Sequence, residues 1–218
     1  MKRLLLPVLI IMMACTTPAI SKAKPRVNTV GKALQATVAL QGFFGRTFCS
    51  GVIVDHKVLT AFHCIEDGTP VFVKTHEDRW EAAVWKTDKL DDLAVLVPAD
   101  GHALGSGIRL ARKAPTWGDD VWAIGHALGK YEYSVTKGIV SYPKREDGVF
   151  GGVWFQHDAG TVGGNSGGPV VNKHGRLVGI TSFGVIQGIY CALGCPGAYQ
   201  DTHINGAVHL SPIRALLR

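Results

Sequence analysis

The sequence predicts an all-β fold of about a dozen strands. Charged residues make up 18% of the 218-residue chain, below the roughly 25% found in ordinary soluble domains. Glycine is abundant, with 27 residues, and short runs of Val, Ile and Leu recur between turn-forming residues. The chain shows no helical heptads, internal repeat or low-complexity tract. Its length allows one two-lobed domain with a sizeable core.

Two groups of strands are predicted, with a break between them. Pro115 and Gly118 interrupt the pattern, so we place an interlobe linker at 113–118, between lobes at 28–112 and 119–218. Asp55-His56 and Lys173-His174-Gly175 are predicted turns, and Ser211-Pro212 is predicted to start a short last helix with serine at the N-cap. The predicted strands are 36–41, 51–54, 57–60, 70–74, 81–85 and 93–97, then 121–124, 134–140, 152–156, 168–172, 176–183 and 204–210.

The N-terminus is typical of a secretory signal. Lys2 and Arg3 precede an apolar run, Leu4 to Ala14, that is too short to span a bilayer as a mature helix. Met12-Met13-Ala14-Cys15 resembles a bacterial lipobox, although the usual lipobox has Leu where Met12 stands, and lipidation of Cys15 would tether the protein to a membrane. Ser21-Lys22-Ala23 is an alternative small-x-small cleavage site. Residues 1–23 are expected to be a signal peptide, and cleavage before Cys15 and cleavage after Ala23 both stay open.

The charge balance argues against nucleic-acid binding. The formal net charge is +6, but three of the basic residues lie in the predicted signal, which leaves +3 for the mature chain. No Lys/Arg block with interleaved aromatic residues appears. We therefore expect no nucleic-acid partner.

The most informative motif is Gly164-Asn165-Ser166-Gly167-Gly168-Pro169. A serine between glycines can expose its hydroxyl on a tight turn, and the N–H groups of Gly164 and Ser166 can then stabilise the oxyanion of a tetrahedral intermediate. A serine hydroxyl is a poor nucleophile at neutral pH, so it needs a base that is oriented by a carboxylate. The candidates are His63 in Thr60-Ala61-Phe62-His63-Cys64, and Asp92 in Asp91-Asp92-Leu93-Ala94-Val95-Leu96.

These three motifs, in the order His63, Asp92, Ser166, closely resemble those of the trypsin-like (chymotrypsin-fold) serine peptidases, over roughly residues 38–210. The motif register favours Asp92 over Asp91 as the triad carboxylate. The resemblance implies two six-stranded antiparallel β-barrels and a site between them. The segments Ser134 to Ser141 and Asp158 to Ser166 look like those of bacterial HtrA-type proteases. Asn165 replaces the aspartate with which animal trypsins switch on their zymogens, so we expect no such activation.

The resemblance also implies the substrate-binding residues. Gly160 and Thr161 are expected at the floor of the primary pocket, and Thr181 and Gly184 on its walls. No aspartate stands at Gly160, which disfavours Arg or Lys. Thr161 matches glutamyl endopeptidases, but their pocket histidine would fall at Thr181. We therefore expect a small or medium uncharged side chain, with the substrate paired as a strand along Ser182, Phe183 and Gly184.

Five cysteines fit export to an oxidising compartment. The resemblance implies a Cys49–Cys64 disulfide beside the active site. Cys191 and Cys195 are close in sequence, so a small loop-closing disulfide is expected, with a metal pair as the rival interpretation. A metalloprotease is disfavoured because no helix-borne His pair with a glutamate appears, and we expect no metal or cofactor.

Two classes of function remain open. The first is an exported serine endopeptidase, in the periplasm, envelope or medium, that cleaves peptides or proteins through an acyl-enzyme. The second is a catalytically silent relative that serves as an envelope binding or structural protein. HtrA-type enzymes carry a downstream PDZ module, and this sequence ends at Arg218, soon after its last predicted strand, so we expect none. An intact triad favours the enzyme, although it can be held in a resting state.

Overall fold

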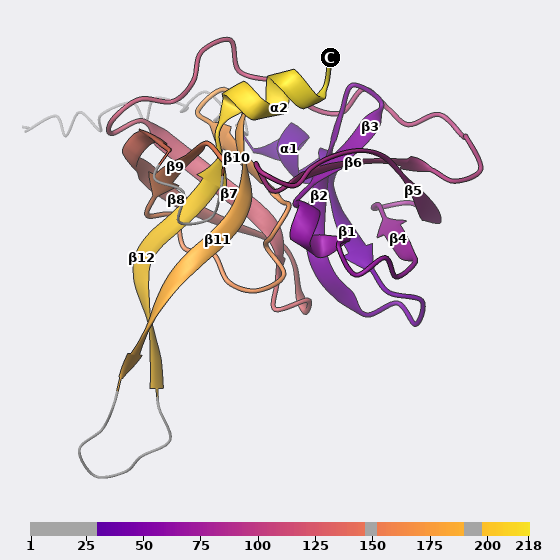
Figure 1. The fold of residues 1–218 in the computed structure, drawn as a ribbon, viewed down its shortest axis with the longest axis horizontal. Coiled ribbons are helices and arrows are strands. Elements are labelled where there is room, and N and C mark those ends of the chain that lie inside the picture. The colour runs from indigo at the N-terminus through magenta and orange to yellow at the C-terminus, as the bar shows by residue number, and fades with distance from the viewer. Residues whose placement is uncertain (1–29, 147–151, 190–197) are drawn as a thin grey trace, which may run out of the picture.

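The computed structural model describes residues 30–146, 152–189 and 198–218, and it folds as two closed antiparallel barrels of six strands each (Figure 1). This confirms the all-β prediction and the two-barrel architecture that the resemblance implies. The first barrel has the order β1-β2-β3-β6-β5-β4, and the second β10-β11-β12-β9-β8-β7. The first contains β1 (Thr37–Gln41), β2 (Thr47–Val54), β3 (Lys57–Thr60), β4 (Val71–Lys74), β5 (Arg79–Asp88) and β6 (Leu93–Pro98). The second contains β7 (Asp120–Ala127), β8 (Tyr131–Arg145), β9 (Trp154–His157), β10 (Pro169–Asn172), β11 (Leu177–Ile189) and β12 (Ala198–Val208).

Three apolar clusters hold the barrels. One fills the first barrel and one the second, because inward-facing residues alternate along each strand. A third joins Leu59 and Leu93 of the first barrel to Ile124 and Ile180 of the second, and all four are at most 1% exposed. The boundary between the barrels is therefore packed as a core, which sets the relative position of any site built from both.

The segment from 99 to 119 connects the barrels and is pinned to each, and it contains the predicted linker 113–118. Gly107 has φ +65°, and a Cβ there would overlap the carbonyl oxygen of Ile53, so only glycine fits. The N–H of Ile108 donates to Ile53 O at 3.0 Å, and that of Ala111 donates to Leu177 O at 2.8 Å. The connection therefore acts as a clamp rather than a free tether.

Two short helices complete the described chain. The sequence analysis did not predict α1 (Gly31–Ala36), whose six residues leave little periodicity to detect. The last helix, α2 (Leu210–Leu216), was expected, but its predicted cap was wrong. His209 is the N-cap: its Nδ1 accepts the Ser211 N–H at 3.2 Å, because an imidazole nitrogen can replace a hydroxyl oxygen as acceptor. Neither helix of the described residues is long and apolar enough to cross a membrane.

Some expectations fall outside the described residues. They are the signal at 1–23 with the lipidation candidate Cys15, and the pair Cys191 and Cys195.

Candidate active site

His63 lies on η1 (Phe62–Cys64), a 3-10 helix of one turn that follows β3. The Phe62 N–H donates to Asp92 O at 3.1 Å, and Cys64 is bonded to Cys49 of β2 with an S–S distance of 1.97 Å. These two links fix the turn from both ends. The two sulfurs lie within 4.8 Å of a ring nitrogen of His63, but they are bonded to each other and so offer no thiolates to a metal.

Asp92 ends the turn before β6 and faces His63. It has φ +50°, a left-handed conformation that aspartate tolerates better than most residues. Its carboxylate accepts the His63 backbone N–H at 2.9 Å, and Oδ2 lies 2.9 Å from His63 Nδ1. The Ser182 hydroxyl of β11, in the other barrel, donates to Oδ2 at 2.5 Å. Three donors therefore hold the carboxylate against the imidazole.

The pair is electrically complementary. The hydrogen bond to Asp92 raises the pKa of His63 above its ordinary value near 6.5, and burial of the ring offsets this only in part. Burial by itself would raise the pKa of Asp92, but the hydrogen bonds from His63 and Ser182 outweigh it and lower that pKa. Asp92 is thus ionised at neutral pH, so His63 Nδ1 carries the proton and Nε2 is left as the basic nitrogen.

The carboxylate of the neighbouring Asp91 binds a different part of the protein. Its Oδ1 accepts the Val153 N–H at 2.6 Å, and burial raises its pKa. The carboxylate of Asp91 therefore ties the first barrel to the segment before β9, whereas that of Asp92 faces the histidine.

Ser166 lies in the loop before β10 and is fixed by backbone bonds. The Ser50 N–H donates to Ser166 O at 2.8 Å, and the Gly167 N–H donates to Thr181 O at 2.8 Å. Gly167 has φ +81°, and a Cβ there would overlap Ser50 O and the Thr60 hydroxyl. The glycine after the serine is therefore required by close approach of the other barrel.

The Gly164 N–H is oriented by a tight turn. The Asn165 N–H donates to Val162 O at 3.0 Å, and Gly164, the third residue of that turn, has φ +93°, which defines a type II turn. The Gly163 carbonyl points away and accepts the Leu128 N–H at 2.6 Å. Within the described residues, neither the Gly164 N–H nor the Ser166 N–H has an acceptor, so both are available to an oxyanion.

The hydrogen bonds of the described residues do not include one between His63 and the Ser166 hydroxyl. The two residues are neighbours, because the Cys64 Sγ lies 3.8 Å from Ser166 O. Catalytic hydrogen bonds are often long without substrate and tighten in the reacting complex.

A cleft of about 260 Å³ opens beside the pair. His63, Asp92 and Ser182 line it together with Phe183, whose ring packs against Trp154 at 4.8 Å between centroids. Ser182 and Phe183 were expected to contact substrate, and here the Ser182 hydroxyl also binds the carboxylate.

Two of the four residues expected in the primary pocket contact a residue that the sequence analysis did not identify. The Thr161 hydroxyl donates to Asn205 Oδ1 at 2.6 Å, and Gly184 pairs with Asn205 across β11 and β12. Gly160 accepts a hydrogen bond from Thr136, while Thr181 supports the serine loop through its backbone. No motif marks Asn205; only the register of the two strands could have found it.

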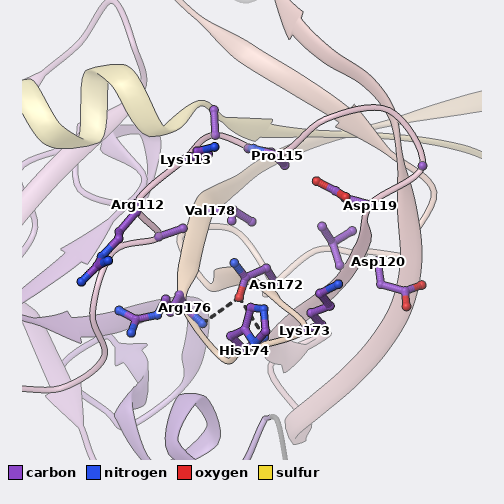
Figure 2. Close-up of a pocket in the computed structure, with 14 residues that line it drawn as sticks. Arg112, Lys113, Pro115, Asp119, Asp120, Asn172, Lys173, His174, Arg176 and Val178 are labelled. Carbon is purple, nitrogen blue, oxygen red and sulfur yellow. Dashed lines mark hydrogen bonds between the residues drawn. The ribbon is translucent and has the colours of Figure 1, made fainter.

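A larger cavity, of about 800 Å³, is separate from these residues. It lies between the segment that joins the barrels and the β10–β11 hairpin (Figure 2). Arg112 and Arg176 lie on one side of it and Asp119 and Asp120 on the other. None of the candidate catalytic residues lines it, whereas His63 and Asp92 both line the smaller cleft.

Comparison with known proteins agrees with this geometry. The family model of the trypsin-like peptidase domain matches residues 49–180, which is more than half of the chain. The chain therefore belongs to the trypsin-like peptidase family.

Individual relatives narrow the likeness to HtrA-type proteases. Serine endoprotease DegS of Escherichia coli K12 is 38% identical over 63% of this chain and 40% of its own length. DegS of Salmonella typhimurium is 34% identical over 75% of this chain and 47% of its own length. A serine endoprotease structure from Yersinia pestis superposes with a TM-score of 0.68 at 29% identity, covering 87% of this chain and 64% of that one. The chain spans less than half the length of these DegS relatives.

Proposed function

We propose that this protein is a serine endopeptidase. Ser166 attacks the scissile carbonyl, and His63 Nε2 takes the hydroxyl proton as the Oγ–C bond forms. The N–H groups of Gly164 and Ser166 hold the oxyanion. His63 then protonates the amine that leaves, and water, deprotonated by the same nitrogen, hydrolyses the acyl-enzyme and restores the Ser166 hydroxyl.

The observation that carries this proposal is the environment of Asp92. Its carboxylate accepts both the backbone N–H and the Nδ1 of His63, together with the Ser182 hydroxyl. This arrangement leaves Nε2 basic and would stabilise the imidazolium that forms during the reaction. The more exposed pair of His102 and Asp100 makes the same two bonds, but among the described residues its carboxylate receives no third donor from the other barrel.

Labelling with a serine-directed fluorophosphonate tests the proposal. The purified mature protein should be labelled and should cleave unfolded protein substrates, and Ser166→Ala should do neither while keeping the same unfolding temperature. A folded, disulfide-intact wild type that is not labelled would contradict the proposal and favour the silent binding protein.

The substrate preference we propose is a small or medium uncharged P1 side chain. The Asn205 side chain lies against Thr161 and would be 3.0 Å from a Cβ at Gly184, so it fills space where a long side chain would extend. No ionised group stands among these residues to pair with a charged P1 side chain. Cleavage-site mapping on a denatured proteome checks this; a majority of cuts after Arg, Lys or Glu would refute it.

We also propose that the protein works outside the cytoplasm, as its N-terminal pattern and the Cys49–Cys64 disulfide suggest. A relative from Hahella chejuensis bears the name "Probable periplasmic serine endoprotease DegP-like". Mass spectrometry of the mature N-terminus distinguishes a lipidated Cys15 from cleavage after Ala23, and an intact Met1 would contradict export by either route.

A further inference from the structure

Ser50 occupies an unusual position between the barrels. It belongs to β2 of the first barrel and is fully buried, but within the described residues its hydroxyl bonds only to groups of the second barrel. It donates to Gly164 O at 2.7 Å. The backbone N–H of His126, in β7, donates to the same hydroxyl at 2.9 Å, and His126 Nδ1 lies 3.1 Å from it.

The number of protons fixes the direction of each bond. A carbonyl can only accept, so the single hydroxyl hydrogen of Ser50 goes to Gly164 O. The two lone pairs of the hydroxyl then accept from the His126 backbone and from Nδ1, which must carry the ring proton. Burial lowers the pKa of His126 to about 4, so the neutral ring with one N–H is the form present at neutral pH.

These bonds constrain the peptide planes of the oxyanion loop. Ser50 holds Gly164 O through its side chain and Ser166 O through its backbone N–H. Leu128 holds the carbonyl of Gly163, on the other side of Gly164. With the peptide planes before and after Gly164 both fixed, its N–H has one direction available.

We propose that Ser50 and His126 form a brace between the barrels that positions the oxyanion hole. The inference rests on the proposed peptidase function. Neither residue contacts the reacting atoms; both are positioning residues that act through Gly164 and Ser166. Because the oxyanion exists only after attack, the brace should stabilise the transition state and leave binding of the uncut peptide unaffected.

Steady-state kinetics of Ser50→Ala test this. We expect kcat to fall about 10- to 100-fold, less than the loss of a whole oxyanion donor, with KM within about twofold of wild type. Affinity for a peptide aldehyde with alanine at P1, which forms a hemiacetal oxyanion mimic on Ser166, should fall by the same factor.

A matched control separates positioning from stability. The Thr37 hydroxyl is also fully buried and makes a 2.7 Å hydrogen bond, to Ala33 O, away from the loop. Thr37→Val should lower the unfolding temperature about as much as Ser50→Ala does but leave kcat unchanged. If the two variants have the same kcat, or if Ser50→Ala changes only KM, the inference is wrong.

His126 offers a second, independent comparison. The Nδ2 of an asparagine lies as many bonds from Cβ as the Nδ1 of histidine, so His126→Asn retains a donor to Ser50, whereas His126→Leu removes it. Both lose the edge-on contact of the ring with Tyr133. We expect His126→Asn to recover most of the kcat that His126→Leu loses. Equal loss in both would indicate that the ring only fills space.

Failure of the proposed function would be visible separately, as a wild type without turnover or labelling. The brace is then tested by amide ¹H–¹⁵N spectra, in which Ser50→Ala should shift the Gly164 and Asn165 resonances while Thr37→Val does not. Unchanged resonances would overturn the inference.

Discussion

The two halves of the candidate site are held by different means. In the His63 half, side chains around one charged group provide the restraint: the Asp92 carboxylate binds the imidazole, and the Ser182 hydroxyl binds Asp92. In the Ser166 half the restraints are mostly backbone groups and glycines, with Gly164 and Gly167 both at positive φ and the uncharged Ser50 hydroxyl bound to the Gly164 carbonyl. The first half should therefore respond to changes of charge and pH, and the second to changes of backbone shape. Each experiment below breaks one half or tests this separation.

The largest effect is expected from His63→Ala. Removal of the base should lower kcat by about a millionfold, because a serine hydroxyl without a base is barely nucleophilic. The assay is hydrolysis of a chromogenic peptide, with the melting temperature as a control for folding. Retention of more than one per cent of wild-type kcat would contradict the role given to His63.

Asp92→Asn should lower kcat by about 10⁴-fold, since an amide can donate to Nδ1 and favour the wrong tautomer. The pH profile should change as well. His63 must be neutral to act as a base, so wild-type activity should rise with pH through a His63 pKa above 6.5. Without the carboxylate, burial remains and lowers that pKa, so the residual activity should rise at lower pH. An unshifted acid limb of kcat/KM would be inconsistent with the pairing.

Gly164→Ala tests the backbone half. A Cβ there would overlap the His126 carbonyl oxygen at a φ of +93°, so the turn must distort and the N–H must move. We expect a loss in kcat of about 10²- to 10³-fold, with the acid limb of the pH profile unchanged. Gly163→Ala, where no atom lies within 4 Å of an added Cβ, should cost far less. A shift of the acid limb in Gly164→Ala would show that the halves are not separable.

The buried histidines of the second barrel contrast with His63. Burial lowers the pKa of His157 to about 4 in the folded protein. Between about pH 6.5 and pH 4 the imidazole is therefore protonated in the unfolded chain but neutral in the folded one. Stability is therefore complete above about pH 6.5 and declines as pH falls to about 4, by about 3 kcal/mol from this residue. Urea unfolding of wild type and His157→Phe at pH 7 and pH 4 measures it. Equal declines in the two proteins would contradict the assignment.

The smallest effect is expected from Ser182→Ala. Loss of one hydrogen bond to a carboxylate that keeps its other donors should lower kcat about tenfold. A loss beyond a thousandfold would mean that Asp92 depends on Ser182 far more than its two bonds to His63 suggest.

The sequence predicted the candidate residues of the site better than the contacts that position them. His63, Asp92 and Ser166 lie in motifs in which the residue type itself carries the chemistry, and every predicted strand overlaps an observed one. The register that brings Asn205 opposite Gly184 is set by the pairing of β11 with β12 inside the second barrel, whereas the approach of Ser50 to Gly164 follows from packing of the two barrels on each other. Asn205 and Gly184 are 21 positions apart, and Ser50 and Gly164 are 114 apart, so no local pattern records either contact.

Strand ends were the other weakness. The strand predicted at 134–140 extends over Tyr131–Arg145 as β8, because pairing with β7 and β9 continues through register shifts where the alternation is lost. The N-cap of the last helix was wrongly predicted at Ser211 for a related reason. The helix begins directly after β12 ends at Val208, so His209 occupies the N-cap position.

The Cys49–Cys64 bond joins the two halves of the site. Cys49 immediately precedes Ser50, which holds the oxyanion loop, and Cys64 immediately follows His63. One covalent bond thus links the residue next to His63, the base, to the residue next to Ser50, which belongs to the brace. Reduction of this one bond would therefore remove a covalent restraint beside the base and beside the brace in the same event.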